Sequence, residues 1–151
     1  MNTSTITIDP LVVTRGRDLL ERAHLLFDNA DSVPDDAERF RQFYLTALRA
    51  AGAALAMYEI PTRPSRRRNS RSAWARIAAT IPALADQAAH FARLSTMRMD
   101  IEAGIRRSVD PGQVTVMRET VLDFLDDAEQ IVIAYEQGKL AHQLAHADRT
   151  A

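Results

Sequence analysis

The chain has 151 residues, a length that predicts one domain able to bury its own core without a disulfide or a structural metal. Its hydrophobic fraction of 46% and charged fraction of 26% are those of an ordinary folded protein and argue against wholesale disorder. The 19 basic residues nearly balance the 20 acidic ones, which argues against a uniformly basic nucleic-acid binder, and the lack of cysteine excludes a thiol nucleophile and a thiolate metal site.

Two helices are expected in the first part of the chain. The first begins at Asp9-Pro10, with Asp as the cap and Pro in the first turn, and runs to about Asn29. The second opens with acidic residues from Asp35 onward, where the helix dipole favours them, and Ile60-Pro61 ends it. In both segments the apolar residues recur at the spacing of one helical face, which predicts that each buries that face against a neighbour.

The next segment has an unusual composition. Residues 61–71 (PTRPSRRRNSR), here called the arginine segment, contain no apolar anchor, and from Pro61 to Arg76 there are six arginines and no acid. Arginine forks bind phosphate oxygens in pairs, so the segment is a candidate nucleic-acid contact. A solvated loop that offsets the charge of acidic helices is the alternative. The candidate binding residues are Arg63, Arg66, Arg67, Arg68 and Arg71.

Two further helices complete the expected fold. Ser72 can cap a third helix, which Pro82 interrupts and which then continues to about Ile105. The last helix starts at residues 110–112 (DPG) and Gly138 can end it. The sequence therefore predicts an all-α, up-down antiparallel bundle of four long helices, the third broken. The expected domain limits are a disordered tail over 1–8, the bundle over 9–138 and a polar tail over 139–151.

Three groups of charged or titratable residues are candidates for a metal site, for catalysis or for an interface. Aspartates 123, 126 and 127 cluster on the last helix, where they either hold a divalent cation or form a solvated face. His142 and His146 have zinc-helix spacing, but Gln143 stands where the metalloprotease motif needs its general base. Arg98 and Glu102 can form a pair four residues apart that either holds helices together or lies at a cleft or subunit interface. No metal ligand is assigned.

Other signals are missing. The sequence has no phosphate-binding glycine loop, no Gly-x-Ser-x-Gly motif and no dinucleotide fingerprint, so no cofactor is expected. The start of the chain is polar and unlike a signal peptide, and no apolar stretch is long enough to span a bilayer. We therefore expect a cytoplasmic protein with no membrane partner.

Several short motifs follow one another in an order that is typical of a known family. A Tyr- and Ala-rich second helix and the arginine segment are followed by Ser72-x-Trp74, by Pro82-x-Leu84, by residues 90–92 (HFA) and by residues 98–104 (RMDIEAG). In this order, over about residues 10–137, the chain resembles the HEPN-domain superfamily, in particular a small branch found in high-GC bacteria. The resemblance implies an α-helical bundle that commonly forms a homodimer. Many members are metal-independent ribonucleases or act in toxin–antitoxin, defence or stress systems.

The sequence departs from the superfamily's catalytic signature, an Arg followed after four to six residues by a His near the start of a late helix. Arg106 and Arg107 precede the last helix, but no His occurs between His90 and His142, and no residue is assigned a catalytic role. We therefore expect a non-catalytic binding module for nucleic acid or for a protein that handles it. The alternatives are a divergent ribonuclease and a protein–protein scaffold subunit.

Overall fold

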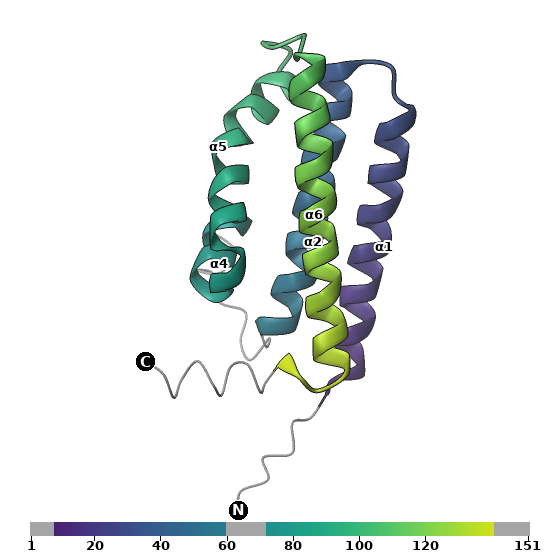
Figure 1. The fold of residues 1–151 in the computed structure, drawn as a ribbon, viewed down its shortest axis with the longest axis vertical. Helices are drawn as coiled ribbons and strands as arrows, with labels where there is room; N and C mark the ends of the chain where they lie inside the picture. The colour runs from purple at the N-terminus through teal and green to yellow at the C-terminus, as the bar shows by residue number, and fades with distance from the viewer. Residues whose placement is uncertain (1–7, 60–71, 141–151) are drawn as a thin grey trace, which may run out of the picture.

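The computed structural model of the protein describes residues 8–59 and 72–140. The elements in chain order are α1 (Pro10–Ser32), α2 (Asp36–Tyr58), α4 (Ala73–Thr80), the 3-10 helix η1 (Pro82–Leu84), α5 (Ala85–Glu102) and α6 (Pro111–Glu136). In Figure 1, α1 lies on one side of the α2–α6 pair, and α4 and α5 lie on the other. The α-helices pack antiparallel, as predicted, and the described residues include no strand.

The helix starts are those that the sequence predicts. The carboxylate of Asp9 accepts a hydrogen bond from the Leu11 amide at 2.9 Å, and that of Asp35 accepts from the Glu38 amide at 3.0 Å. Ser72 caps α4, and Asp110 caps α6. Each cap satisfies a backbone N–H that has no partner inside the helix, which explains why the chain leaves its extended conformation at these residues.

The predicted interruption of the third helix is also confirmed. α4 ends at Thr80, and Pro82 begins η1, because the proline ring lacks the N–H that would continue the helix. α5 ends at Glu102, slightly before the expected limit near Ile105. Gly104 has a φ of +74°, a left-handed conformation that glycine adopts at little cost and that turns the chain toward α6.

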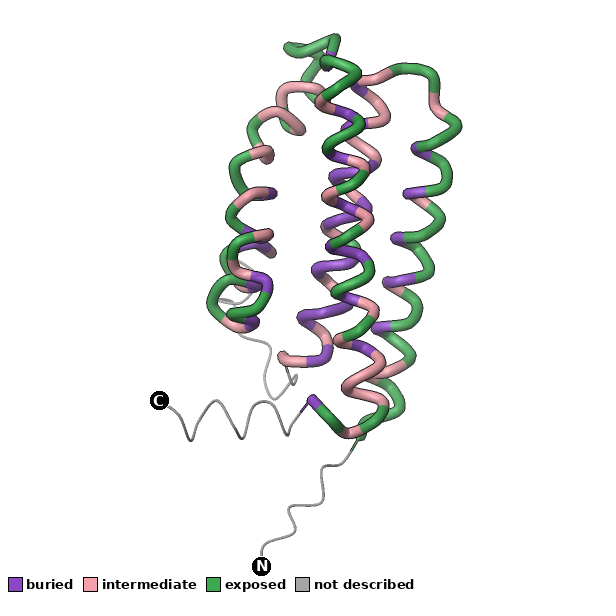
Figure 2. Tube along the Cα trace, in the orientation of Figure 1, coloured by how far each residue is buried: buried purple, intermediate pink, exposed green. Residues whose placement is uncertain are grey.

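α2 is the central helix of the bundle. Five of its alanines (Ala47, Ala50, Ala51, Ala53 and Ala54) are fully buried, so that small side chains face neighbours on several sides. α2 packs against α1 and α6 most extensively, and against α4 and α5 as well. Figure 2 shows buried residues along its whole length, whereas α1 is buried on one face only. α2 therefore lies at the centre of the bundle, and the other α-helices pack around it.

An aromatic cluster joins the α4–α5 side to the rest of the bundle. Trp74 stacks on Phe91 with ring centroids 4.8 Å apart, and Phe124 of α6 meets both rings edge-on at 5.8 and 5.2 Å. Tyr44 of α2 completes the cluster with its ring at 6.1 Å from that of Trp74. Such pairs contribute about 0.5–1.5 kcal/mol each beyond the area they bury. Trp74 and the fully buried Ile77 are the two buried residues of the short helix α4.

The predicted limits of the bundle remain predictions. Residues 1–7 and 141–151, which make up most of the two expected tails, lie outside the described residues. Beyond α6, the Lys139 amide donates to the Ala134 carbonyl at 2.8 Å, and Leu140 is buried. The described core therefore includes one residue of the segment that was expected to be a polar tail.

Candidate functional site

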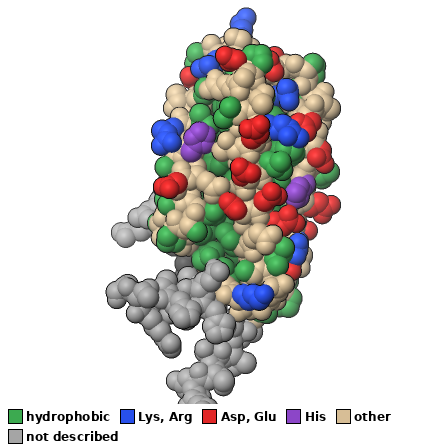
Figure 3. All heavy atoms as spheres, viewed as in Figure 1, with side chains coloured by type: hydrophobic (Ala, Val, Ile, Leu, Met, Phe, Trp, Pro, Cys, Tyr) green, Lys and Arg blue, Asp and Glu red, His purple; other side chains and the backbone are tan. Residues whose placement is uncertain are grey.

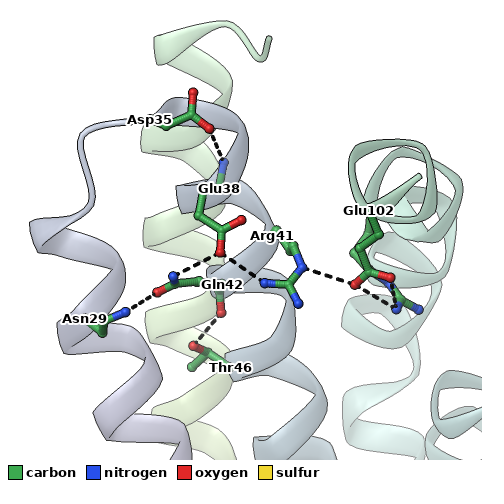
Figure 4. A network of polar contacts seen from close by, with 8 residues as sticks. Asn29, Asp35, Glu38, Arg41, Gln42, Thr46 and Glu102 are labelled. Carbon is green, nitrogen blue, oxygen red and sulfur yellow. Dashed lines mark hydrogen bonds and ion pairs between the residues drawn. The ribbon is translucent and has the colours of Figure 1, made fainter. Parts of the chain in front are cut away.

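Arg98 and Glu102 form the pair that their spacing predicts, and a third residue joins them. Arg98 Nη1 lies 3.3 Å from both carboxylate oxygens of Glu102, near the C-terminal end of α5. Arg41 of α2 donates from Nε to Glu102 Oε1 at 3.3 Å and from Nη1 to Glu38 at 3.0 Å (Figure 4). We call these four residues the Glu102 cluster. It ties the end of α5 to the first half of α2.

Hydrogen bonds extend the Glu102 cluster to α1. Gln42 donates to Glu38 at 3.2 Å, and Asn29 of α1 donates to Gln42 at 2.7 Å (Figure 4). The charged side chains of the cluster are 25–39% exposed, and exposed ion pairs contribute only about 0–1 kcal/mol each. The network therefore links three helices and adds little to stability.

Arg98 is the most enclosed member of the cluster. Its guanidinium carbon lies 5.2 Å from the centroid of the Tyr44 ring, and its buried Nε has no hydrogen-bond partner among the described residues. The Tyr44 hydroxyl accepts a hydrogen bond from Trp74 Nε1 at 2.8 Å. Stacking on the ring face compensates part of the desolvation of the guanidinium, and Glu102 balances its charge. The guanidinium of Arg98 is thus fixed between the Tyr44 ring and the Glu102 carboxylate that balances its charge.

A separate cavity lies at the other end of α2. It has a volume of about 330 Å³ and lies between α1, α2 and α4. Four charged residues line it, namely Arg15, Arg49, Glu59 and Arg76. Arg76 Nε donates to Glu59 at 3.0 Å, and its second donor also reaches that carboxylate. This contact raises the pKa of Arg76 above its ordinary value. Arg76 is the sixth arginine of the stretch from Pro61 to Arg76 that contains no acid, but its charge is balanced by Glu59 within the bundle.

Described residues on both sides of the arginine segment line this cavity. Arg63, Arg66, Arg67, Arg68 and Arg71 lie outside the described residues. The described residues on either side of the segment include Glu59 and Ala73, and both line the cavity. The cavity walls also carry Arg15 and Arg49, from α1 and α2. The sequence gives no sign that these two arginines share a cavity with Glu59 and Ala73, because only the packing of α1 on α2 brings them together.

The comparison with known families agrees with this fold. A family model described as SAV_6107-like HEPN matches residues 30–129, more than half of the chain. The chain belongs to the HEPN family. The match extends from the end of α1 into α6 and includes the Glu102 cluster apart from its contact to α1. No curated protein and no solved structure matches this HEPN chain.

The histidines of this HEPN domain do not form the ribonuclease signature. His24 is exposed on α1, with Nε2 4.0 Å from Glu129, and His90 meets the edge of Phe91 at 5.7 Å. Arg17, whose spacing to His24 fits the signature, instead binds Glu136 through two hydrogen bonds of 2.6 and 2.7 Å. His142 and His146 lie outside the described residues. Among the described residues, the arginine that stands at the signature spacing before a histidine is therefore already paired with a carboxylate.

The acidic face of α6 is open to solvent. Asp123, Asp126 and Asp127 are exposed, and Asp127 accepts a hydrogen bond from Gln87 at 3.1 Å. Figure 3 shows acidic side chains along α6 on the face toward the viewer. Over residues 8–59 and 72–140, no three potential metal ligands gather at one point. Within the same ranges, no helix is both long and apolar enough to cross a membrane.

Proposed function

We propose that this HEPN domain is a non-catalytic module that binds single-stranded nucleic acid through the arginine segment. The supporting observation is the arrangement of charge around the segment's two ends. Its five arginines carry no acid among them, and the cavity beside its flanks adds Arg15, Arg49 and Arg76 against Glu59 alone. Such a concentration of arginine attracts phosphates even in a chain whose net charge is −1. The toxin–antitoxin, defence or stress setting belongs to the same proposal.

The contacts would be electrostatic and independent of base sequence. A planar guanidinium can donate to two phosphate oxygens at once, so successive arginines can follow a flexible backbone. Each phosphate contact to a single strand adds about −0.7 to the slope of log affinity against log salt. Three to five contacts then correspond to a slope of about −2 to −3.5.

The test is a titration of labelled single-stranded RNA by fluorescence anisotropy at several salt concentrations. The triple variant Arg66→Gln, Arg67→Gln, Arg68→Gln removes three charges from the segment. We expect it to weaken binding by about tenfold or more and to flatten the salt slope by about 2. The matched control removes three exposed arginines elsewhere, through Arg93→Gln, Arg106→Gln and Arg107→Gln. We expect the control to change affinity by less than about threefold.

Three results would count against the proposal. Equal losses in the two triple variants would indicate that only net charge matters. Unchanged binding in the segment variant would remove the segment's role. The same samples run on a denaturing gel address the enzymatic alternative, since shortened RNA would show a ribonuclease. In that case Ala replacements of His24 and His90 would identify the histidine used.

A specific observation also favours association with a second copy of the chain. Met99, Ile105 and Val116 are 50%, 76% and 56% exposed, and they lie around the connection between α5 and α6. Exposed apolar side chains gathered at one end of a helical bundle are typical of an interaction surface. Arg98 and Glu102 lie on the adjoining stretch of α5, and in this proposal they belong to the homodimer interface. Sedimentation of wild type and of Ile105→Glu tests this homodimer, because the variant should be monomeric where wild type is dimeric.

A further inference from the structure

The cavity between α1, α2 and α4 has the size and lining of a small ligand site. Its volume of about 330 Å³ lies at the lower end of the range for ligand pockets in proteins. Its apolar walls consist of Val12, Leu19, Leu48, Gly52, Leu55, Ala56 and Ala73. Among the described residues none that lines it is aromatic, so the cavity offers no ring on which a nucleic-acid base could stack. Aliphatic walls favour an aliphatic ligand.

The charged residues that line the cavity favour an anion. Glu59 is bound by Arg76, and these side chains are only 20% and 28% exposed, so this pair forms a fixed, neutral part of the wall. Arg15 and Arg49 line the same cavity from α1 and α2. They leave the cavity with an excess of two positive charges. A carboxylate is recognised by arginine forks through paired hydrogen bonds.

We propose that this cavity binds an aliphatic carboxylate of medium length. The alkyl chain lies between α1 and α2, and the carboxylate contacts Arg15 and Arg49. The volume equals about eleven water volumes at ~30 Å³ each, which fits a ligand of about ten non-hydrogen atoms, such as octanoate. A ligand of that size is expected to bind with a Kd of about 1 mM. Arg15 and Arg49 enter both proposals, but octanoate binding is measured without RNA, so its failure is distinguishable from the failure of nucleic-acid binding by the arginine segment.

A substitution at Gly52 can fill part of the cavity. It lines the cavity from the middle of α2, and a Cβ placed on it would lie 3.6 Å from Leu19 Cδ1, an ordinary van der Waals distance. Gly52→Ala therefore fits without displacing its neighbours and favours the helix. Gly52→Leu adds three more carbons that occupy the space of the ligand's alkyl chain. The alanine variant is the matched control for the leucine variant.

The experiment uses the full chain, labelled with nitrogen-15 and titrated with octanoate, hexanoate and octylamine while amide shifts are recorded. We expect saturable shifts at residues around the cavity with octanoate and much weaker binding of octylamine, whose charge is wrong. Removal of two methylenes should weaken binding by up to about fifteenfold in hexanoate, at about fourfold per methylene. Arg49→Gln should weaken octanoate binding by about fivefold or more, whereas Arg93→Gln on α5 should not change it.

The outcomes separate cleanly. Loss of octanoate binding in Gly52→Leu with retention in Gly52→Ala supports the cavity as the site. Absence of saturable shifts near the cavity at octanoate concentrations of about ten times the expected Kd would overturn the proposal. Equal binding of octanoate and octylamine would also overturn it, since it would show apolar adsorption without carboxylate recognition. Arg49→Gln decides the matter if the leucine variant fails to fold.

Discussion

Removal of one hydroxyl group tests how α4 is anchored. The Tyr44 hydroxyl is the acceptor for the indole N–H of Trp74, at 2.8 Å in the buried aromatic cluster. Tyr44→Phe keeps the ring, so the contacts with Trp74 and with the Arg98 guanidinium remain. The indole N–H, however, stays buried without an acceptor, because Trp74 is only 4% exposed. The variant thus isolates one hydrogen bond from the packing around it.

The expected cost follows from the buried donor. A buried polar group that loses its partner costs about 1–3 kcal/mol, a sizeable part of a total stability of about 5–15 kcal/mol. For a domain of this size, that cost corresponds to a fall in Tm of about 2–10 °C. Urea unfolding followed by circular dichroism at equilibrium measures the free energy directly.

Two controls make the result interpretable. Tyr58→Phe removes a hydroxyl from a partly exposed tyrosine on the same helix and should cost less than about 0.5 kcal/mol. In a Trp74→Phe background the donor is absent, so Tyr44→Phe should cost almost nothing there. The reasoning is refuted if Tyr44→Phe costs as little as the Tyr58 control, or if its cost is the same in both backgrounds.

Three smaller predictions concern the ends of the helices. Arg118 binds Asp31 at 2.8 Å and lowers the pKa of that carboxyl, so the pair stabilises the fold above the usual carboxyl pKa, and the gain is lost as pH falls through the lowered one. Arg118→Gln should therefore cost at most about 1 kcal/mol at neutral pH. This is less than the pKa shift of Asp31 alone implies, because the Asp31 side chain is 38% exposed. Urea titrations should show that the difference in unfolding free energy between wild type and variant vanishes in acid. Asp35→Ala removes the α2 cap and should cost about 0.5–2 kcal/mol, whereas Asp35→Asn should restore most of it. Gly104→Ala should lower stability by about 1–2 kcal/mol through its positive φ, since open space surrounds the position and no clash would account for a loss of Tm.

The anchoring of α4 bears on the proposed function. The first turn of α4 contacts the α2 region at two places, through the hydrogen bond of Trp74 to Tyr44 and through the pair of Arg76 with Glu59, the C-cap of α2. The described residues Glu59 and Ala73, on either side of the arginine segment, line the same cavity as Arg15 and Arg49, and the proposed function depends on this proximity. Variants that loosen α4 should for this reason weaken RNA binding more than their loss of stability alone predicts.

Much of the fold could be predicted because its signals are local. The caps at Asp9, Asp35, Ser72 and Asp110 are each read within a few residues, and the apolar spacing of a helix is set by its own geometry. The break at Pro82 is equally local, because a proline removes an N–H wherever it occurs. The sequence predicts that the helix ends near Ile105, because that apolar residue continues the pattern past Gly104, whereas α5 ends at Glu102.

The site depended on contacts between distant parts of the chain. The spacing of Arg98 and Glu102 predicts their pair, but Arg41 lies 61 positions before Glu102, and nothing in the local pattern indicates that it joins them. The balance of Arg76 by Glu59 and the cavity walls contributed by α1 likewise arise only when the helices pack. Secondary structure here follows from backbone chemistry that each segment carries itself, whereas the choice of partner for each charge follows from which helix faces meet, and that choice is made by the tertiary structure.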